Sequence, residues 1–259
     1  MPSALVGYSG FVGSTLVAQA SFDDLYRSTN IDEIDRREYD LLICAGAPAA
    51  KWKANQAPGE DLANLRRLME HLARVQVGVA VLISTIDVYP APVEVYEDTR
   101  IDPETSAAYG RHRLYLEEFF TNCFARVFTI RLPGLFGRGL RKNFIFDLLR
   151  NPGSLPMTHH ESVFQFYDMS RLWADVQRVI AARVSLINFA TPPVAAREVA
   201  LRCFGVEFTN VTPSGPVHYD VRTRHASIFG RSGDYIASQE EVLEQIARFV
   251  GNERGGSNA

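Results

Sequence analysis

The chain has 259 residues, of which 46% are hydrophobic and 22% are charged, a composition typical of a globular protein with a sizeable core. Its formal net charge is only −3 and its basic residues form no long run, which argues against a nucleic-acid partner. No stretch approaches the apolar length of a membrane span and no targeting segment is evident, so we expect a cytoplasmic protein with a small-molecule substrate and no membrane partner.

Apolar runs typical of buried strands alternate along the chain with segments of helical periodicity. We expect strands at 4–6, 25–28, 41–45, 77–84, 127–132 and 186–190. We expect helices at 11–20, 61–75, 109–120, 170–182 and 239–250, and a frayed end at 251–259. Alternation of this kind predicts crossover units and an α/β fold with a parallel sheet.

Three glycines lie between the first predicted strand and the first predicted helix, at Gly7, Gly10 and Gly13. Gly7 suits a tight turn, Gly10 suits a close approach of the backbone to a pyrophosphate, and Gly13 suits close packing of helix on strand. The amides at the start of the helix would then face the phosphates. The pattern predicts a Rossmann-type, doubly wound sheet that binds a dinucleotide, although a turn with packing glycines and no ligand stays an alternative.

The end of the second predicted strand determines which nicotinamide dinucleotide is preferred. No acidic residue stands there to bind the adenosine ribose, whereas Arg27 and Ser28 do. An arginine and a hydroxyl suit the additional phosphate of NADP. We therefore expect NADP or NAD, with a slight preference for NADP, and keep the alternative that Arg27 is a solvated surface residue.

Two later segments make the pattern more specific. Residues 84–89 read Ser-Thr-Ile-Asp-Val-Tyr at the end of a strand, and residues 109–113 read Tyr-Gly-Arg-His-Arg at the start of a helix. Together with the glycine turn, they resemble the extended short-chain dehydrogenase/reductase family, in the branch rich in nucleotide-sugar epimerases, dehydratases and reductases. The Cys-Ala-Gly run at 44–46 and the Arg-Leu-Pro-Gly-Leu-Phe-Gly run at 131–137 extend the resemblance.

The resemblance implies roles for three residues. Tyr109 matches the tyrosine that exchanges a proton with the substrate oxygen, and Thr85 matches the hydroxyl that binds the same oxygen. Arg113 stands one helical turn after Tyr109, where the family has lysine. It would keep the positive charge that lowers the phenol pKa, but it cannot release a proton.

The predicted cofactor-binding set follows from the glycine turn, the second strand and the resemblance. It consists of Gly7, Ser9, Gly10, Phe11, Val12, Gly13, Arg27, Ser28, Ala45, Gly46, Ser84, Tyr109, Arg113 and Pro133. We expect a dinucleotide-binding domain at 1–132, completed by 168–190. Glycines, prolines and aromatic residues break up the chain beyond it, so 133–167 and 191–259 are predicted to form a small substrate-binding region.

Charged and polar residues near the predicted cleft suit a nucleotide-linked substrate. The candidates are Asp87, Lys51, Arg138, Lys142 and Asn143. Gly134 stands where the family has an asparagine, and Ile86 stands where a dehydratase needs an acid, so dehydration is not expected. The adjacent histidines at 159 and 160 lack a ligand set with metal spacing, and we predict no metal.

These observations predict an enzyme that transfers hydride between NAD(P) and a secondary alcohol or keto group of a nucleotide-linked sugar, with a tyrosine acid/base. Both reduction and epimerisation fit, and the short chain favours reduction. The alternative is a catalytically silent, NADP-binding sensor or regulatory protein, because Arg113 and Gly134 depart from the family pattern. By resemblance, the helices predicted at 61–75 and 109–120 suggest a homodimer.

Overall fold

The computed structural model describes residues 2–255, and these residues divide into two compact units. Unit 1 contains residues 2–91, 98–132 and 172–187, whereas unit 2 contains residues 92–97, 133–171 and 188–255. All predicted residues of the glycine turn and of the hydroxyl, phenol and cation group belong to unit 1. Within the described residues, no helix has the length and apolar character needed to cross a lipid bilayer.

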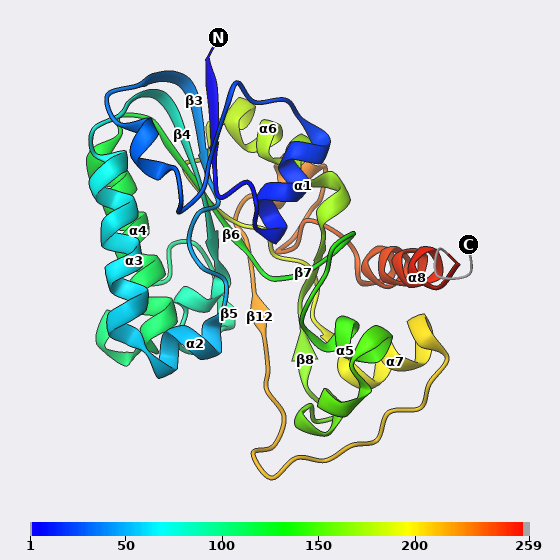
Figure 1. Ribbon diagram of the computed structural model, residues 1–259. Coiled ribbons are helices and arrows are strands. Elements are labelled where there is room, and N and C mark those ends of the chain that lie inside the picture. The colour runs from blue at the N-terminus through cyan, green and yellow to red at the C-terminus, as the bar shows by residue number, and fades with distance from the viewer. Residues whose placement is uncertain (1, 256–259) are drawn as a thin grey trace. The chain divides into compact units, whose positions relative to one another are not determined.

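A six-stranded sheet organises unit 1 (Figure 1). Its strands are β1 (Ser3–Val6), β2 (Asp24–Tyr26), β3 (Glu38–Cys44), β4 (Gln76–Thr85), β6 (Val127–Leu132) and β10 (Leu186–Asn188), in the order β10-β6-β4-β3-β1-β2. The pairs β1 with β2, β1 with β3, β3 with β4 and β4 with β6 are all parallel. The predicted α/β fold with a parallel sheet is therefore confirmed.

The strand order differs in one respect from the general Rossmann order. That order places a third strand beyond the second one at the sheet edge, whereas β2 is itself the edge strand here. The chain between β2 and β3, residues 27–37, forms only the short 3₁₀ helix η1 (Ile31–Ile34), because a helical crossover needs a dozen or more residues. The regular alternation of strand and helix thus fails at this one place.

The winding of the chain reverses around β1. The first connection leads from β1 to β2 on one side, and the next crosses to β3 on the other side. In doubly wound sheets, ligands bind outside the carboxyl ends of the strands at such a reversal. Residues that follow β1 and β3 are therefore placed where the fold receives a ligand.

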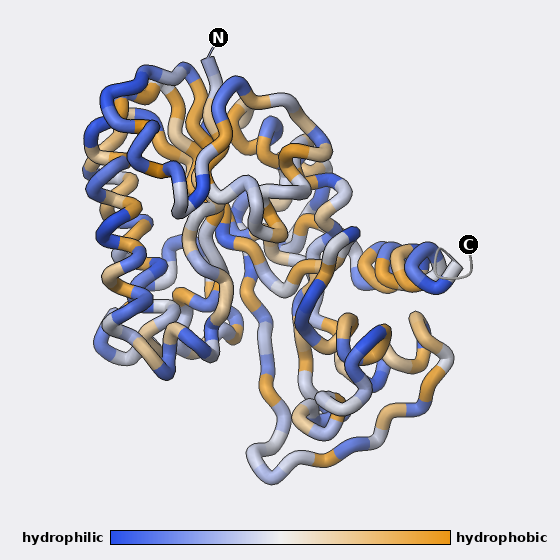
Figure 2. The backbone as a smooth tube through the Cα atoms, viewed as in Figure 1, coloured by the Kyte–Doolittle hydropathy of each residue, from blue (hydrophilic) through white to orange (hydrophobic). Residues whose placement is uncertain are grey.

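Helices cover both faces of the sheet in unit 1 (Figure 1). Helices α3 (Pro58–Leu72) and α4 (Ala108–Cys123) pack against each other, as do α1 (Phe11–Gln19) and α6 (Leu172–Ala182). Leucines of α3 and α4 join β1, β3 and β4 in one buried core, and Figure 2 shows hydrophilic residues along the outer side of α3. The predicted helices are confirmed, with ends shifted by a few residues, and α2 (Lys51–Gln56) is an addition.

Unit 2 is built from three short strand pairs and three α-helices. The pairs are β5 (Val93–Val95) with β12 (Asp220–Val221), β7 (Gly134–Phe136) with β9 (Phe166–Asp168), and β8 (Val163–Phe164) with β11 (Val194–Ala195). The helices are α5 (Phe144–Arg150), α7 (Ala196–Phe204) and α8 (Gln239–Gly255). Because α8 continues to Gly255, residues 251–255 are helical rather than frayed, and 256–259 lie outside the described residues.

Candidate active site

The first and third glycines of the turn after β1 are required by the packing of the protein on itself. Gly7 has φ of +87°, and a Cβ there would lie 2.4 Å from the carbonyl oxygen of Ala45. A Cβ on Gly13 would lie 2.0 Å from the carbonyl oxygen of Gly7. The turn therefore runs directly against the end of β3, where Ala45 and Gly46 follow.

Gly10 has no such reason to be a glycine. The nearest atom to a Cβ at this position is the Gly7 carbonyl oxygen at 3.4 Å, an ordinary contact, and the φ of −78° suits any residue. Both Ser9 and Gly10 are exposed. A close approach of a ligand to the backbone explains a glycine here, and this observation favours a ligand-binding turn over a plain one.

Helix α1 begins at the turn with its first amides uncapped. Gly10 occupies the N-cap position without a side-chain hydrogen bond, and the first turn contains no acidic residue. Phe11 and Val12 stand in that turn, where backbone N–H groups have no acceptor within the helix. The turn thus combines an open backbone with a helix end that favours anions.

The end of β2 lies beside the glycine turn. The Gly7 N–H donates to the Tyr26 carbonyl oxygen at 2.7 Å, and the Arg27 guanidinium carbon lies 5.9 Å from the ring centroid of Tyr8. The Arg27 Nε also donates to Thr29 Oγ1 at 2.9 Å. Arg27 and Ser28 are both exposed, so each side chain is accessible from solvent beside the turn.

Tyr109 is held at the start of α4 by contacts from two other segments. Its backbone N–H donates to Asn55 Oδ1 of α2 at 2.9 Å, and the side chain is buried, with 7% of its residue surface exposed. A Cβ on Gly110 would lie 2.2 Å from the Asp87 carbonyl oxygen, so α4 rests directly on the turn after β4. Neither Asn55 nor Gly110 was predicted, although a glycine directly after the tyrosine is a signal in the sequence.

The turn after β4 fixes Thr85 close to this helix start. Thr85 caps the 3₁₀ helix η2 (Ile86–Val88), and its Oγ1 accepts the Asp87 backbone N–H at 3.1 Å. Asp87 also forms an ion pair with Lys51 of α2, with Nζ and Oδ1 2.6 Å apart. The structure therefore brings together Asp87 and Lys51, which come from separate parts of the sequence.

Arg113 is engaged by a carboxylate that sequence reasoning missed. Its two terminal nitrogens donate to the two oxygens of Asp61 on α3 at 3.0 and 3.1 Å, and one also donates to the Pro48 carbonyl oxygen at 2.5 Å. The guanidinium carbon lies 4.5 Å from the Tyr109 ring centroid. Asp61 further contacts His112 Nδ1 at 2.8 Å. The signal in the sequence is an acid in register with the buried stripe of α3, at Asp61, Leu65, Leu68 and Leu72.

Burial dominates the protonation of the phenol. Burial raises the pKa of Tyr109 above its ordinary value, and the charge of Asp87 adds to this, while Arg113 and Lys51 oppose it. Arg113 thus acts in the predicted direction, yet the net pKa lies above the ordinary range. For Asp61, burial alone would raise the pKa, but hydrogen bonds from Arg113 and His112 hold it below its usual value.

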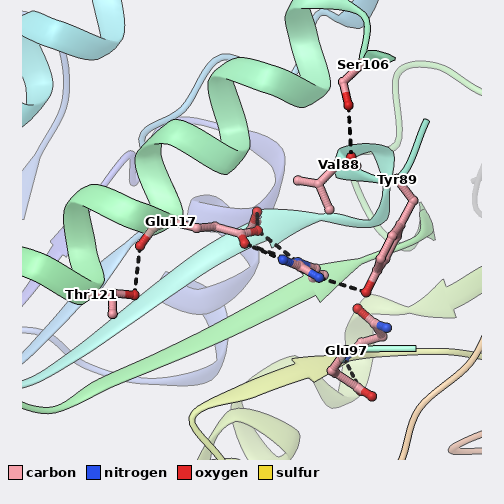
Figure 3. Close-up of polar contacts among 9 residues, drawn as sticks. Val88, Tyr89, Glu97, Ser106, Glu117 and Thr121 are labelled. Carbon is pink, nitrogen blue, oxygen red and sulfur yellow. Dashed lines mark hydrogen bonds and ion pairs between the residues drawn. The ribbon is translucent and has the colours of Figure 1, made fainter. Parts of the chain in front are cut away.

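Ser84, a predicted cofactor residue, belongs to a buried polar network. Figure 3 shows Glu117 and Tyr89 of this network. Its hydroxyl donates to Glu117 Oε1 at 2.5 Å, and Glu117 also accepts from Arg131 at 2.6 Å. Arg131 in turn donates to the Tyr89 hydroxyl at 2.7 Å. Burial alone would lower the pKa of Arg131, but Glu117 raises it above its usual value. The network ties β4, β6 and α4 together, so the Ser84 hydroxyl has a structural partner.

The remaining predicted residues belong to unit 2. Pro133 is buried directly after β6, and Arg138 and Lys142 are exposed. The Asn143 amide caps α5, because Oδ1 accepts from the Phe146 N–H at 3.1 Å and Nδ2 donates to the Leu135 carbonyl oxygen at 2.8 Å. The structure thus gives Asn143 a structural role that the sequence interpretation did not include.

One group of possible metal ligands occurs among residues 2–255. Side chains of His159, His160 and Glu161 bring their ligand atoms within 4.8 Å of one another. The Glu161 backbone N–H donates to His159 Nδ1 at 3.1 Å, and the Glu161 carboxylate lies 3.8 Å from Arg197. The expectation of no metal stays a prediction.

No family model matches the chain, and no curated protein matches it. Solved structures do. MoeE5 in complex with UDP-glucose and NAD is 17% identical with a TM-score of 0.73, and the match covers 100% of both chains. dTDP-4-dehydrorhamnose reductase from Bacillus anthracis in complex with NADP is 15% identical with a TM-score of 0.70, covering 96% of this chain and 98% of the other.

An epimerase shares the same architecture. UDP-N-acetylglucosamine 4-epimerase from Methanobrevibacter ruminantium, in complex with UDP-N-acetylmuramic acid, is 13% identical with a TM-score of 0.68. That match covers 96% of this chain and 97% of the epimerase. The chain therefore shares the Rossmann-type fold of these three solved structures over nearly its whole length.

Proposed function

We propose that this chain is an NAD(P)-dependent reductase or epimerase that acts on a secondary alcohol or keto group of a nucleotide-linked sugar. The observation that carries the proposal is Gly10, an exposed glycine that no contact within the protein requires, at the uncapped start of α1. The similar structures support it, because they include a nucleotide-sugar reductase and an epimerase and two of them hold NAD or NADP.

The cofactor residues follow from the geometry of unit 1. Backbone amides at the uncapped start of α1, at Phe11 and Val12, would hold the pyrophosphate, and Gly10 would let it approach the backbone. Ala45 and Gly46 border the same reversal of the sheet. Arg27 and Ser28 are exposed beside the turn, where they would bind the additional phosphate of NADP. When bound, the nicotinamide supplies or accepts the hydride.

The chemistry on the protein side is a proton transfer at the Tyr109 hydroxyl. Thr85, held by the Asp87 backbone, would bind the substrate oxygen, and Tyr109 would give it a proton or take one from it. Arg113 lies against the Tyr109 ring and holds positive charge beside it. We propose that the sugar and its nucleotide are bound by Asp87, Lys51, Arg138 and Lys142. Asn143 is a weaker candidate for this role, because its amide already caps a helix.

Calorimetry followed by turnover tests this proposal. Purified protein should bind NADPH, and incubation with a panel of keto-sugar nucleotides should consume NADPH in the wild type and not in Tyr109→Phe. An unchanged calorimetric baseline with both NADPH and NADH would end the proposal. A homodimer formed through α3 and α4 is a separate part of it, which sedimentation would test.

A catalytically silent NADP-binding sensor is the second candidate. The observation in its favour is that both terminal nitrogens of Arg113 are bonded to Asp61, whereas the family's lysine serves the cofactor and the phenol. The two candidates separate in the turnover assay. Tight NADPH binding with no NADPH consumption, in wild type and Tyr109→Phe alike, would favour the sensor.

A further inference from the structure

Two cationic side chains act on the Tyr109 hydroxyl, and each is paired with its own carboxylate. Arg113, from the same helix, is bonded to Asp61 by both terminal nitrogens. Lys51, from α2, is bonded to Asp87, which follows β4. Arg113, Lys51 and Asp87 act directly on the pKa of Tyr109, whereas Asp61 is linked to it through Arg113. The formal charges of the four groups cancel.

Asp61 is built into this arrangement rather than lying on the surface. Only 6% of the Asp61 surface and 3% of the Arg113 surface are exposed. The carboxylate receives both terminal nitrogens of Arg113 and also contacts His112 Nδ1 at 2.8 Å. A fork-to-fork pair of this kind fixes the position of the guanidinium as well as its charge, so Asp61 determines where Arg113 lies over the Tyr109 ring.

Pairing with a carboxylate changes the effect of a cation on the pKa of a neighbouring phenol. A lone cation within a few ångströms favours the phenolate, whereas burial favours the neutral phenol. A guanidinium bonded to a carboxylate therefore lowers the pKa of the phenol less than a lone guanidinium in the same place would. In the family arrangement a lysine promotes the phenolate. Here Arg113 still lowers the pKa of Tyr109, but its carboxylate partner reduces that effect.

We propose that Asp61 is a positioning residue that neutralises Arg113 and keeps the proton on the Tyr109 hydroxyl, which sets the site for reducing a ketone. In that direction the O–H bond of Tyr109 breaks and its proton goes to the carbonyl oxygen. The carbonyl carbon accepts a hydride from the reduced nicotinamide, which is oxidised, and water returns a proton to Tyr109. The assignment to reduction rests on the proposed function, whereas the protonation of Tyr109 is a property of the chain alone.

The experiment is a titration of the phenol without substrate or cofactor. Protein labelled with ¹³C at tyrosine Cζ is titrated by NMR, and the Tyr109 resonance is identified as the one missing in Tyr109→Phe. Asp61→Asn is expected to lower the pKa of Tyr109 by about 1 or more, because Arg113 then acts uncompensated. Arg113→Gln is expected to raise it, because Asp61 then acts alone.

A matched control exists in the same unit. Asp35 also contacts a histidine and an arginine, His71 Nδ1 at 2.8 Å and Arg74 at 2.6 Å. Neither of these partners belongs to the charged groups that act on Tyr109, which are Arg113, Asp87 and Lys51. Asp35→Asn is expected to leave the Tyr109 titration unchanged. A shift as large as that of Asp61→Asn would mean that the effect is not specific.

The double variant Asp61→Asn/Arg113→Gln keeps the test decisive if Asp61→Asn does not fold, because it leaves no buried charge unpaired. Its Tyr109 pKa is expected within about 0.5 of the wild-type value, since a compensated pair has been replaced by a neutral one. A double variant that titrates like Arg113→Gln would overturn the inference, as would an unshifted Asp61→Asn. Neither result depends on coenzyme binding. The titration therefore tests the role of Asp61 independently of the proposed function.

Discussion

Gly110 and Asp87 lie in direct backbone contact, so close that a Cβ on Gly110 would come within 2.2 Å of the Asp87 carbonyl oxygen. Gly110→Ala must therefore push the start of α4 away from the turn that carries Thr85. We expect a loss of about 1–3 kcal/mol in the free energy of unfolding and a larger loss of turnover than of coenzyme affinity. Urea unfolding and calorimetry measure the two effects, with Gly59→Ala as control, since nothing lies within 4 Å of a Cβ there.

Gly10 gives the opposite prediction. Gly10→Leu is expected to change the free energy of unfolding by less than about 0.5 kcal/mol, because the position is exposed and a Cβ there meets only the Gly7 carbonyl oxygen, at 3.4 Å. Its affinity for NADPH is expected to fall by at least about tenfold, because the side chain occupies the approach of the pyrophosphate. Gly59→Leu, at another exposed glycine near a helix start, should leave the affinity unchanged. Wild-type NADPH affinity in Gly10→Leu would refute the ligand-binding reading of the turn.

Arg27 allows a test of coenzyme preference. The side chain is exposed beside the glycine turn, and a charge-assisted bond to the additional phosphate of NADP is worth about 1.5–3 kcal/mol. Arg27→Gln should therefore weaken NADPH binding by about tenfold or more and leave NADH binding unchanged. Arg66→Gln, which removes an exposed charge from α3, serves as the control for net charge. Equal losses for both coenzymes in Arg27→Gln would remove Arg27 from the phosphate site.

The Asp61 carboxylate predicts how stability depends on pH. Arg113 and His112 hold the pKa of Asp61 below its usual value despite burial, so the unfolded state binds its proton more readily. The stabilisation is fully present above the unfolded pKa of about 3.9 and is lost as the pH falls through the lower folded value. Urea unfolding between about pH 7 and pH 3 should show this loss in the wild type and a weaker one in Asp61→Asn/Arg113→Gln.

The single variant measures the same pair at neutral pH. Asp61→Asn leaves the Arg113 guanidinium buried without its counter-charge, which costs about 3–5 kcal/mol. Asp35→Asn, at a half-exposed pair, should cost about 1 kcal/mol or less. Similar losses in the two variants would show that the Asp61 pair is solvated in solution.

The sequence by itself determined the strands, most of the helices and the turn between β1 and α1. Periods of two and 3.6 residues and the glycine spacing are local properties, so they locate Gly7, Gly13 and Tyr109 on the right elements without knowledge of the fold. The sequence also contains the reason why no further strand lies beyond β2, because residues 27–37 are too few for a helical crossover. Boundaries of α3 and α6 moved by a few residues, since packing decides where a helix ends.

Tertiary structure alone decided which charges meet. Asp61 and Arg113 are 52 positions apart, and Lys51 and Asp87 are 36 apart, so no local pattern reports that they pair. The same holds for Asn143, whose amide caps α5, while its role in substrate binding stays a prediction. Hydrogen bonds and ion pairs depend on distances of a few ångströms between side chains, and those distances exist only once the sheet has brought α2, α3 and α4 together.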